Sequence, residues 1–139
     1  MNSIDYALFR SEFRTALGED GYRRFVAAGT ARRLRYWQEV ELKKFFALHP
    51  ERQLDMTQLA DALRVCELHD GLLQSEVVEV IDGCIDYSQT YLDARRGTFP
   101  HAAADPVSTE GRMDMPTLVS VWYCAACRAA RSAWMNEPP

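Results

Sequence analysis

The sequence predicts a small α+β protein, with N-terminal helices packed on a small β-hairpin and a C-terminal helix. Apolar residues recur at helical spacing through the first part of the chain, and Gly and Pro stand where the segments end. Two short β-branched segments come later, at 75–81 and 118–123. A chain of 139 residues fits one domain with a modest core. We therefore expect a single domain, 1–139, with a helical part at 1–65 and a second part at 66–135.

The helical part contains four segments, each with an apolar stripe and with residue types that start or end a helix. They are Tyr6–Leu17 before Gly18, Tyr22–Ala28 before Gly29, a longer helix from Thr30 to about His49 before Pro50, and a helix that begins at a capping box, Asp55 with Gln58, and leads to Cys66. The longer helix carries Glu41 between Trp37 and Phe45 on its apolar side, which predicts a buried carboxylate.

The second part has the composition of strands and loops. Ser75–Ile81 is rich in β-branched residues and ends at the turn dipeptide Asp82-Gly83, so it predicts a strand. Arg95–Pro116 contains Gly and Pro among small and polar residues and predicts a long loop, whose length is typical of a mobile or functional segment. Leu118–Tyr123 predicts a second strand, and Arg128–Met135 predicts a closing helix.

Two pairs of metal-binding residue types have the spacing of zinc ligands. Cys66 and His69 are separated by two residues, and so are Cys124 and Cys127, which lets each pair point both donors at one tetrahedral ion. A site with four protein ligands is closed, so it serves folding rather than catalysis. The sequence therefore predicts one structural zinc ion, bound by these four residues, that clips the hairpin. The alternative is that Cys66 is a core thiol, His69 a surface imidazole, and the later cysteine pair free.

The second ligand pair is expected where a strand meets a helix. Cys124 ends the strand, and Cys127 falls in the first turn of the helix, whose dipole favours a thiolate there. With the turn at 66–71 and the strand after it, this order of knuckle, hairpin and helix resembles a treble-clef zinc finger. The stretch is also similar to a group of small bacterial proteins of unassigned function, which have a Phe-Pro dipeptide in a loop, here Phe99-Pro100, and a Tyr-Cys-x-x-Cys followed by a basic residue. Both resemblances imply zinc, and neither implies an activity.

Other donors and another chemistry stay open. Cys84 and His101 are spare donors that could each replace one of the four ligands, although Cys is commonly a small buried hydrophobe and a loop His is usually solvated. The segment 122–128 is also similar to a thioredoxin-like redox site, but only 128–139 follow it, where that fold needs further strands and helices. A c-type haem would need a histidine where Arg128 stands.

Two segments bear on nucleic-acid binding. Asp55–Val65 resembles the first helix of a bacterial helix-turn-helix, but Cys66–Ser75, where the recognition helix should follow, has no Lys or Arg. The stretch 21–38 combines basic and aromatic residues without an acidic one, and we call it the arginine-aromatic stretch. The residues of interest in it are Arg23, Arg24, Arg32, Arg33 and Arg35, with Tyr22, Tyr36 and Trp37 beside them. It is either a surface for phosphates, bases or a protein, or a solvated face that pairs with acids such as Glu39.

Composition narrows the class of protein. The net charge of −4 argues against a general polyanion binder. Met1–Asp5 has no feature of a signal peptide, and no apolar run approaches roughly 18 residues, so we expect a cytoplasmic protein that does not contact the membrane. In that compartment cysteines stay reduced, which favours metal ligation over disulfides.

The functional expectation follows from these features. No nucleophile and base pair, phosphate-binding glycine loop or carboxylate cluster supports an enzyme. We expect a zinc-stabilised adaptor or protein-interaction module that presents the arginine-aromatic stretch or the segment 95–116 to a protein partner. A nucleic-acid-binding regulator is the alternative, and an enzyme that uses the metal is the third possibility.

Overall fold

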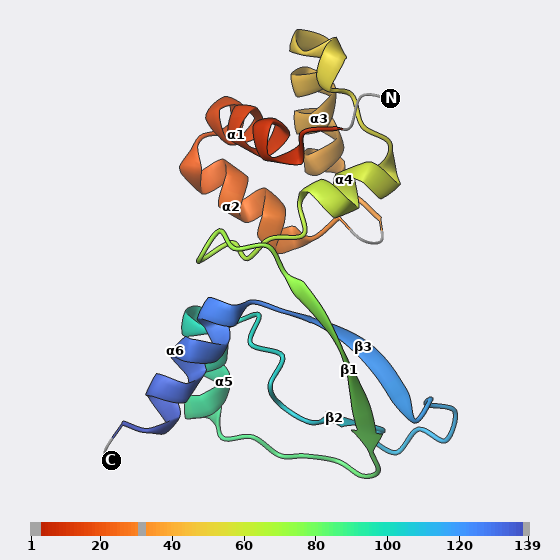
Figure 1. Ribbon diagram of the computed structural model, residues 1–139, viewed down its shortest axis with the longest axis vertical. Helices are drawn as coiled ribbons and strands as arrows, with labels where there is room; N and C mark the ends of the chain where they lie inside the picture. The colour runs from red at the N-terminus through yellow and green to blue at the C-terminus, as the bar shows by residue number, and fades with distance from the viewer. Residues whose placement is uncertain (1–3, 31–32, 138–139) are drawn as a thin grey trace. The chain divides into compact units, whose positions relative to one another are not determined.

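The computed structural model describes residues 4–30 and 33–137 and shows a mixed α and β fold (Figure 1). The chain divides into two compact units, residues 1–67 and 68–139. The described part of the first unit forms helices, whereas the second combines two helices with a three-stranded sheet. This confirms the expected α+β class, and the single domain stays a prediction. Within the two described ranges, no helix is both long enough and apolar enough to cross a membrane.

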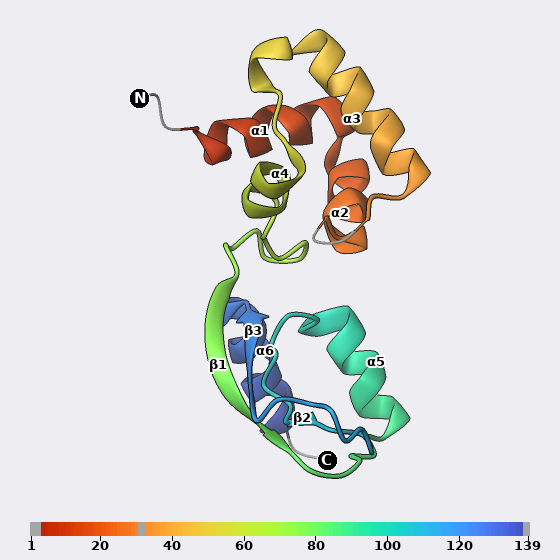
Figure 2. The same cartoon turned by 90° about the vertical axis from the view of Figure 1, so that its right-hand side faces the viewer.

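In the first unit, α1 packs against α2, α3 and α4 (Figure 2). The core of this unit is rich in aromatic rings. The elements are α1 (Tyr6–Leu17), α2 (Glu19–Ala28), α3 (Tyr36–Leu48), a 3-10 turn (Pro50–Arg52) and α4 (Met56–Ala62). The Phe13 ring is fully buried and meets two other rings edge to face, with its centroid 4.9 Å from that of Phe25 and 5.1 Å from that of Phe45. Each such pair contributes about 0.5–1.5 kcal/mol beyond the area it buries. The first unit therefore has a hydrophobic core of its own.

The expected start of the long helix after Thr30 is wrong, because α3 begins only after Arg35. The fully buried side chain of Gln38 explains the later start. Its amide nitrogen donates to the carbonyl oxygens of Phe25 and Gly29, at 3.2 and 3.0 Å, and its oxygen accepts the Arg35 N–H at 2.9 Å. One side chain thus satisfies the end of α2 and the start of α3, where the backbone leaves polar groups unpaired.

The other helices of the first unit largely follow the sequence pattern. α1 has the expected bounds, and α2 begins earlier than expected, at Glu19. α4 opens with the expected capping box, in which the Asp55 carboxylate accepts the Gln58 N–H at 2.8 Å and the Gln58 side chain accepts the Asp55 N–H at 2.9 Å. The helix ends at Ala62, so the chain reaches Cys66 in an irregular segment rather than in the helix.

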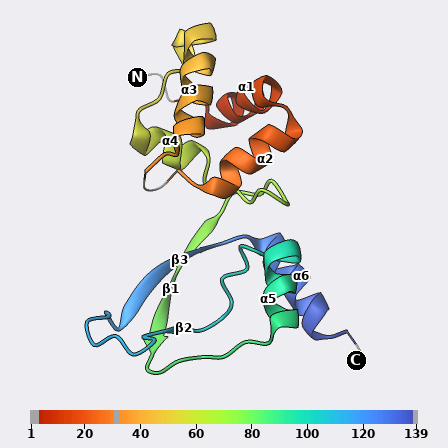
Figure 3. The same cartoon turned by 180° about the vertical axis from the view of Figure 1, so that it is seen from behind.

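In the second unit the strands are ordered β2-β1-β3 (Figures 1 and 3). The elements are β1 (Gln74–Ile81), α5 (Gln89–Thr98), β2 (Val107–Ser108), β3 (Leu118–Tyr123) and α6 (Ala125–Met135). β1 and β3 pair antiparallel with Val77 opposite Ser120, which confirms both expected strands. β2 pairs parallel with β1, and α5 and α6 contact each other.

The segment Arg95–Pro116 is not the continuous long loop that the sequence predicts. Its first residues belong to α5, and β2 interrupts the remainder. α5 starts at a cap in which the Ser88 hydroxyl accepts the Tyr91 N–H at 3.1 Å. Gly97 lies inside its last turn, where glycine is a poor helix former, so the sequence pattern there indicates a loop. The closing helix α6 also begins earlier than expected, at Ala125.

A polar network centred on Asp105 joins α5, α6 and the segment between α5 and β2. The Asp105 carboxylate accepts hydrogen bonds from Arg95 at 3.0 Å, from Arg131 at 3.4 Å and from the Tyr91 hydroxyl, whose oxygen in turn accepts from Arg131 at 3.0 Å. Burial raises the pKa of Tyr91, and its hydrogen bond to Asp105 adds to this. The Tyr91 ring also packs on Trp134 of α6, with centroids 5.6 Å apart. Polar contacts therefore hold α5, α6 and the segment between α5 and β2 together.

Candidate metal centre

The first ligand pair lies in the irregular segment between α4 and β1. Cys66 is fully buried, whereas His69 is exposed. Asp70, which follows the histidine, has a φ of 62°, in the left-handed region that only a tight turn usually imposes on a non-glycine residue. The turn at 66–69 therefore holds its two donors close together, as their spacing in the sequence predicts.

The second ligand pair lies at the start of α6. Cys124 is the N-cap residue, and its Sγ accepts the Cys127 N–H at 3.4 Å. The Cys124 N–H donates to the carbonyl oxygen of His101 at 2.7 Å. This bond fixes the end of β3 to the segment between α5 and β2. Both sulfurs are buried and lie at a helix N-terminus, where the helix dipole stabilises negative charge and so favours thiolates. This confirms the expected placement of Cys127 in the first turn of the closing helix.

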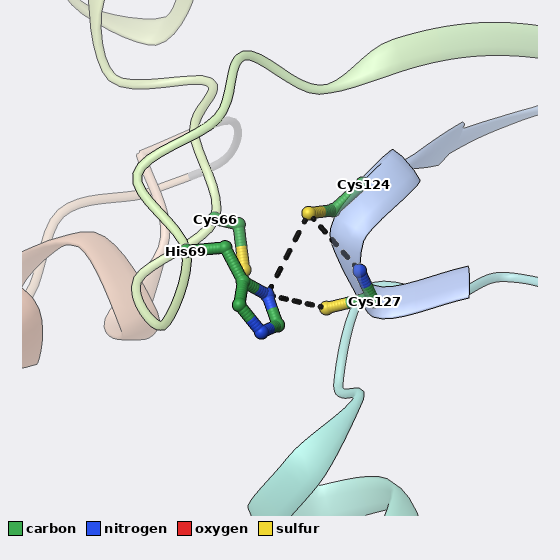
Figure 4. A group of neighbouring side chains, drawn as sticks. All are labelled: Cys66, His69, Cys124 and Cys127. Carbon is green, nitrogen blue, oxygen red and sulfur yellow. Dashed lines mark hydrogen bonds between the residues drawn. The ribbon is translucent and has the colours of Figure 1, made fainter. Parts of the chain in front are cut away.

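The two pairs converge on one point (Figure 4). One donor atom from each of Cys66, His69, Cys124 and Cys127 lies within 4.8 Å of the other three. The Nδ1 atom of His69 is 3.8 Å from Cys124 Sγ and 3.4 Å from Cys127 Sγ. Zinc bonds of about 2.0–2.3 Å at tetrahedral angles place neighbouring ligand atoms roughly 3.3–3.8 Å apart. The four residues thus form a group that could bind a metal ion.

The spare donors fall in different places. Cys84 is exposed and belongs to neither of the donor groups found in the described part of the chain. His101 lies in a second group with Cys66 and Glu67, whose donor atoms are also within 4.8 Å of one another. Glu67 is a neighbour of the site that sequence reasoning missed. Its only signal is its position next to Cys66, and no spacing rule connects it to a histidine in another loop.

The arginine-aromatic stretch is not one continuous surface. Tyr22 is buried in the core, so its expected place on that surface is wrong. Arg24 lies over the Trp37 ring, with its guanidinium carbon 4.7 Å from the centroid, and Arg23 pairs with Glu19 at 2.9 Å. The exposed members that the structure describes are Arg24, Arg33, Arg35 and Tyr36, while Arg32 lies outside the described residues.

Two further expectations are settled by the structure. The Glu41 side chain is 38% exposed and lies 3.9 Å from the ammonium group of Lys44, so the prediction of a buried carboxylate is wrong. No α-helix forms between α4 and β1, which agrees with the absence of a recognition helix after Val65.

No protein-family model, curated protein or solved structure matches this chain. The fold and the site alone therefore define the class, a mixed α and β protein with a cluster of three cysteines and one histidine that could hold a metal ion.

Proposed function

We propose that the chain binds one zinc ion through Cys66, His69, Cys124 and Cys127 and that this ion has a structural role. The proposal is carried by one observation, the convergence of three buried sulfurs and one imidazole nitrogen within 4.8 Å. Sulfur-rich sets of this kind favour zinc, whereas magnesium and calcium take oxygen ligands. Four protein ligands fill a tetrahedron, so no coordination position is left for a substrate.

The proposed zinc unit resembles a treble-clef finger. It would consist of the turn at 66–69, strands β1 and β3, and the N-terminus of α6. α5 and β2 lie between the two strands in the sequence and make the unit longer than the common form of that motif. Metal binding in such small units supplies folding free energy, because the site does not exist in the unfolded chain.

Metal analysis and X-ray absorption test the zinc proposal. Purified protein should hold about one equivalent of zinc, with about three sulfur neighbours near 2.3 Å and about one nitrogen near 2.0 Å. His69→Ala should lower the affinity for zinc, while His101→Ala, the control, should leave it unchanged. If the His101 variant loses zinc and the His69 variant keeps it, the ligand is His101 and the assignment of His69 is wrong.

We further propose that the protein is cytoplasmic and acts as an interaction module for a protein partner rather than as an enzyme. The exposed part of the arginine-aromatic stretch supports this, because Tyr36 is 81% exposed and the Arg33 side chain is exposed nearby in the sequence. Arginine and aromatic residues are enriched at protein interfaces and dominate their energetics. Solvated cations, in contrast, contribute little to the stability of a fold.

The proposed interaction with a protein partner can be tested by reversing one charge in the arginine-aromatic stretch and, as a control, one charge outside it. Arg33→Glu should abolish recovery of a partner from the native cell extract, and Lys43→Glu, an exposed cation on α3, should preserve it. Both variants should melt like the wild type. Equal recovery with both variants would remove the arginine-aromatic stretch from the proposal.

A nucleic-acid-binding regulator is the second candidate, and the same exposed arginines motivate it. Retention on DNA or heparin that falls steeply with salt and is lost in Arg33→Glu would favour this candidate, because phosphate contacts release counterions.

A further inference from the structure

The outer edge of β3 is the feature of the second unit that the proposed zinc site does not use. The strand order β2-β1-β3 makes β3 an edge strand, and Figures 1 and 3 show β1 on one side of it only. The Val80 N–H donates to the Thr117 carbonyl oxygen at 2.9 Å, so odd-numbered residues of β3 turn their backbone groups towards β1. The N–H and C=O groups of Leu118 and Ser120 therefore point to the outer edge.

The outer edge of β3 lacks the charges, prolines and bulges that usually prevent the edges of two sheets from pairing. Natural edge strands carry charged side chains, prolines or bulges, because unpaired backbone groups attract other strands. The six residues from Leu118 to Tyr123 include no charge and no proline, and they pair with β1 in continuous register. The opposite edge differs, since β2 is only two residues long. β3 is thus the edge suited to strand addition.

The side chains of the edge are complementary to themselves. Leu118 and Trp122 stand on the exposed face on either side of Ser120 and are 55% and 44% exposed. An antiparallel copy centred on Ser120 places each Leu118 opposite the other copy's Trp122, and no like charges meet. Val77, opposite Ser120 on β1, is 64% exposed and extends the apolar row inward.

The ends of this pairing are also defined. The Cys124 N–H, which would follow on the outer edge, already donates to His101. In the register centred on Ser120, the residue opposite Cys124 is Pro116, which has no N–H to leave unpaired. The edge can therefore pair with a short strand, and the pairing ends at Cys124, whose N–H is already bonded to His101.

The geometry points to a second copy of this chain as the occupant of the edge. Two β3 strands pair antiparallel about a twofold axis at Ser120 and join the two three-stranded sheets into one. A recognised foreign peptide is usually selected by pockets for alternate side chains. Three clefts in this unit are lined by residues other than Leu118, Ser120 and Trp122, so these clefts do not supply such pockets along the edge.

The size of the contact sets the expected strength. A single strand pair buries less than the roughly 1,200 Å² at which stable interfaces begin. The dimer is therefore weak, and sedimentation of the wild-type chain from about 5 to about 500 μM should show the average mass rising towards that of two chains. A mass that stays at one chain over this range overturns the proposal.

Charge substitutions at the centre of the strand locate the interface. Ser120→Lys places two ammonium groups opposite each other and should keep the chain monomeric, whereas Ser75→Lys, the same change at an exposed position of β1, should leave dimerisation intact. Mixing Ser120→Lys with Ser120→Glu should restore a mixed dimer, which also shows that both variants fold. Dimerisation that persists in Ser120→Lys, or that the mixture fails to restore, overturns the assignment to β3. Zinc content is independent of these outcomes.

Discussion

The two units of the chain use different means to stay folded. The first surrounds Phe13 with other buried rings, and its core also includes aliphatic residues from α3, α4 and the segment after α4. In the second, the described residues that are buried and apolar are only Tyr91, Phe99, Ala102 and two cysteines, and those two cysteines are candidate ligands. The difference indicates that the second unit, whose apolar core is small, needs polar contacts and the proposed metal ion to stay folded.

The largest effect should come from breaking the metal site. We expect Cys127→Ser to unfold the second unit, because a structural zinc ion contributes about 10 kcal/mol or more of apparent binding free energy. Cys84→Ser is the control, since that thiol is exposed and lies outside the cluster. Thermal melts compare the variants, and hydrogen exchange separates the two units. Equal losses in the two variants would show that the cluster is not structural.

The next effect should fall on the first unit. Phe13→Ala removes a fully buried ring that contacts other rings of the core, and we expect a loss of about 3–5 kcal/mol in the free energy of unfolding. Denaturant titration measures the loss, and zinc analysis of the same variant should still give the wild-type content. Zinc lost together with stability would mean that the two units do not fold separately.

The same contrast explains how much of the molecule could be predicted from sequence. The caps and stripes of α1 and α4, both long strands and the Cys-x-x-His and Cys-x-x-Cys pairs are local patterns, and local patterns were sufficient to predict them. That the two pairs meet was an extrapolation from zinc chemistry, which the cluster now supports.

Three of the failures have a common physical cause, which is contact between residues far apart in sequence. The start of α3 depends on Gln38 reaching the end of α2, and no local propensity encodes that contact. α5 is a weak helix by composition and is stabilised by Tyr91 and Arg95, which meet Asp105 from another segment. Glu67 beside His101 was missed for the same reason.

A smaller effect should follow from opening the Asp105 network. Asp105→Ala leaves Arg95, Arg131 and the Tyr91 hydroxyl without their shared acceptor, and the carboxylate is only 17% exposed. We expect a loss of roughly 2 kcal/mol, since hydrogen bonds to charged groups contribute about 1.5–3 kcal/mol each and part of this site is solvated. Asp86→Ala, an exposed aspartate of the same unit, is the matched control. Chemical denaturation that finds the two variants equally stable would show that the network contributes nothing.

The smallest effect concerns an exposed ion-pair group in the first unit. Glu19 accepts hydrogen bonds from Arg14 at 2.6 and 2.7 Å and from Arg23 at 2.9 Å, and the Arg14 contact is the main reason that the pKa of Glu19 is lowered to about 2. A lowered pKa means that the folded state favours the ionised form. The stabilisation is therefore complete above about pH 4.5, the ordinary value, and is lost as the pH falls towards about 2.

The Glu19→Gln variant isolates this contribution. Its stability should fall less steeply between about pH 4.5 and about pH 2 than that of the wild type, and the difference should shrink in high salt, because both partners are partly solvated. Protonation of the proposed metal ligands would also destabilise the protein in acid, but it would affect both proteins alike and cancel in the difference. Glu39→Gln, a first-turn glutamate of α3, controls for the loss of one negative charge. Identical pH profiles for the wild type and Glu19→Gln would mean that the arginine contacts of Glu19 add no stability to the unit that its aromatic core already holds together.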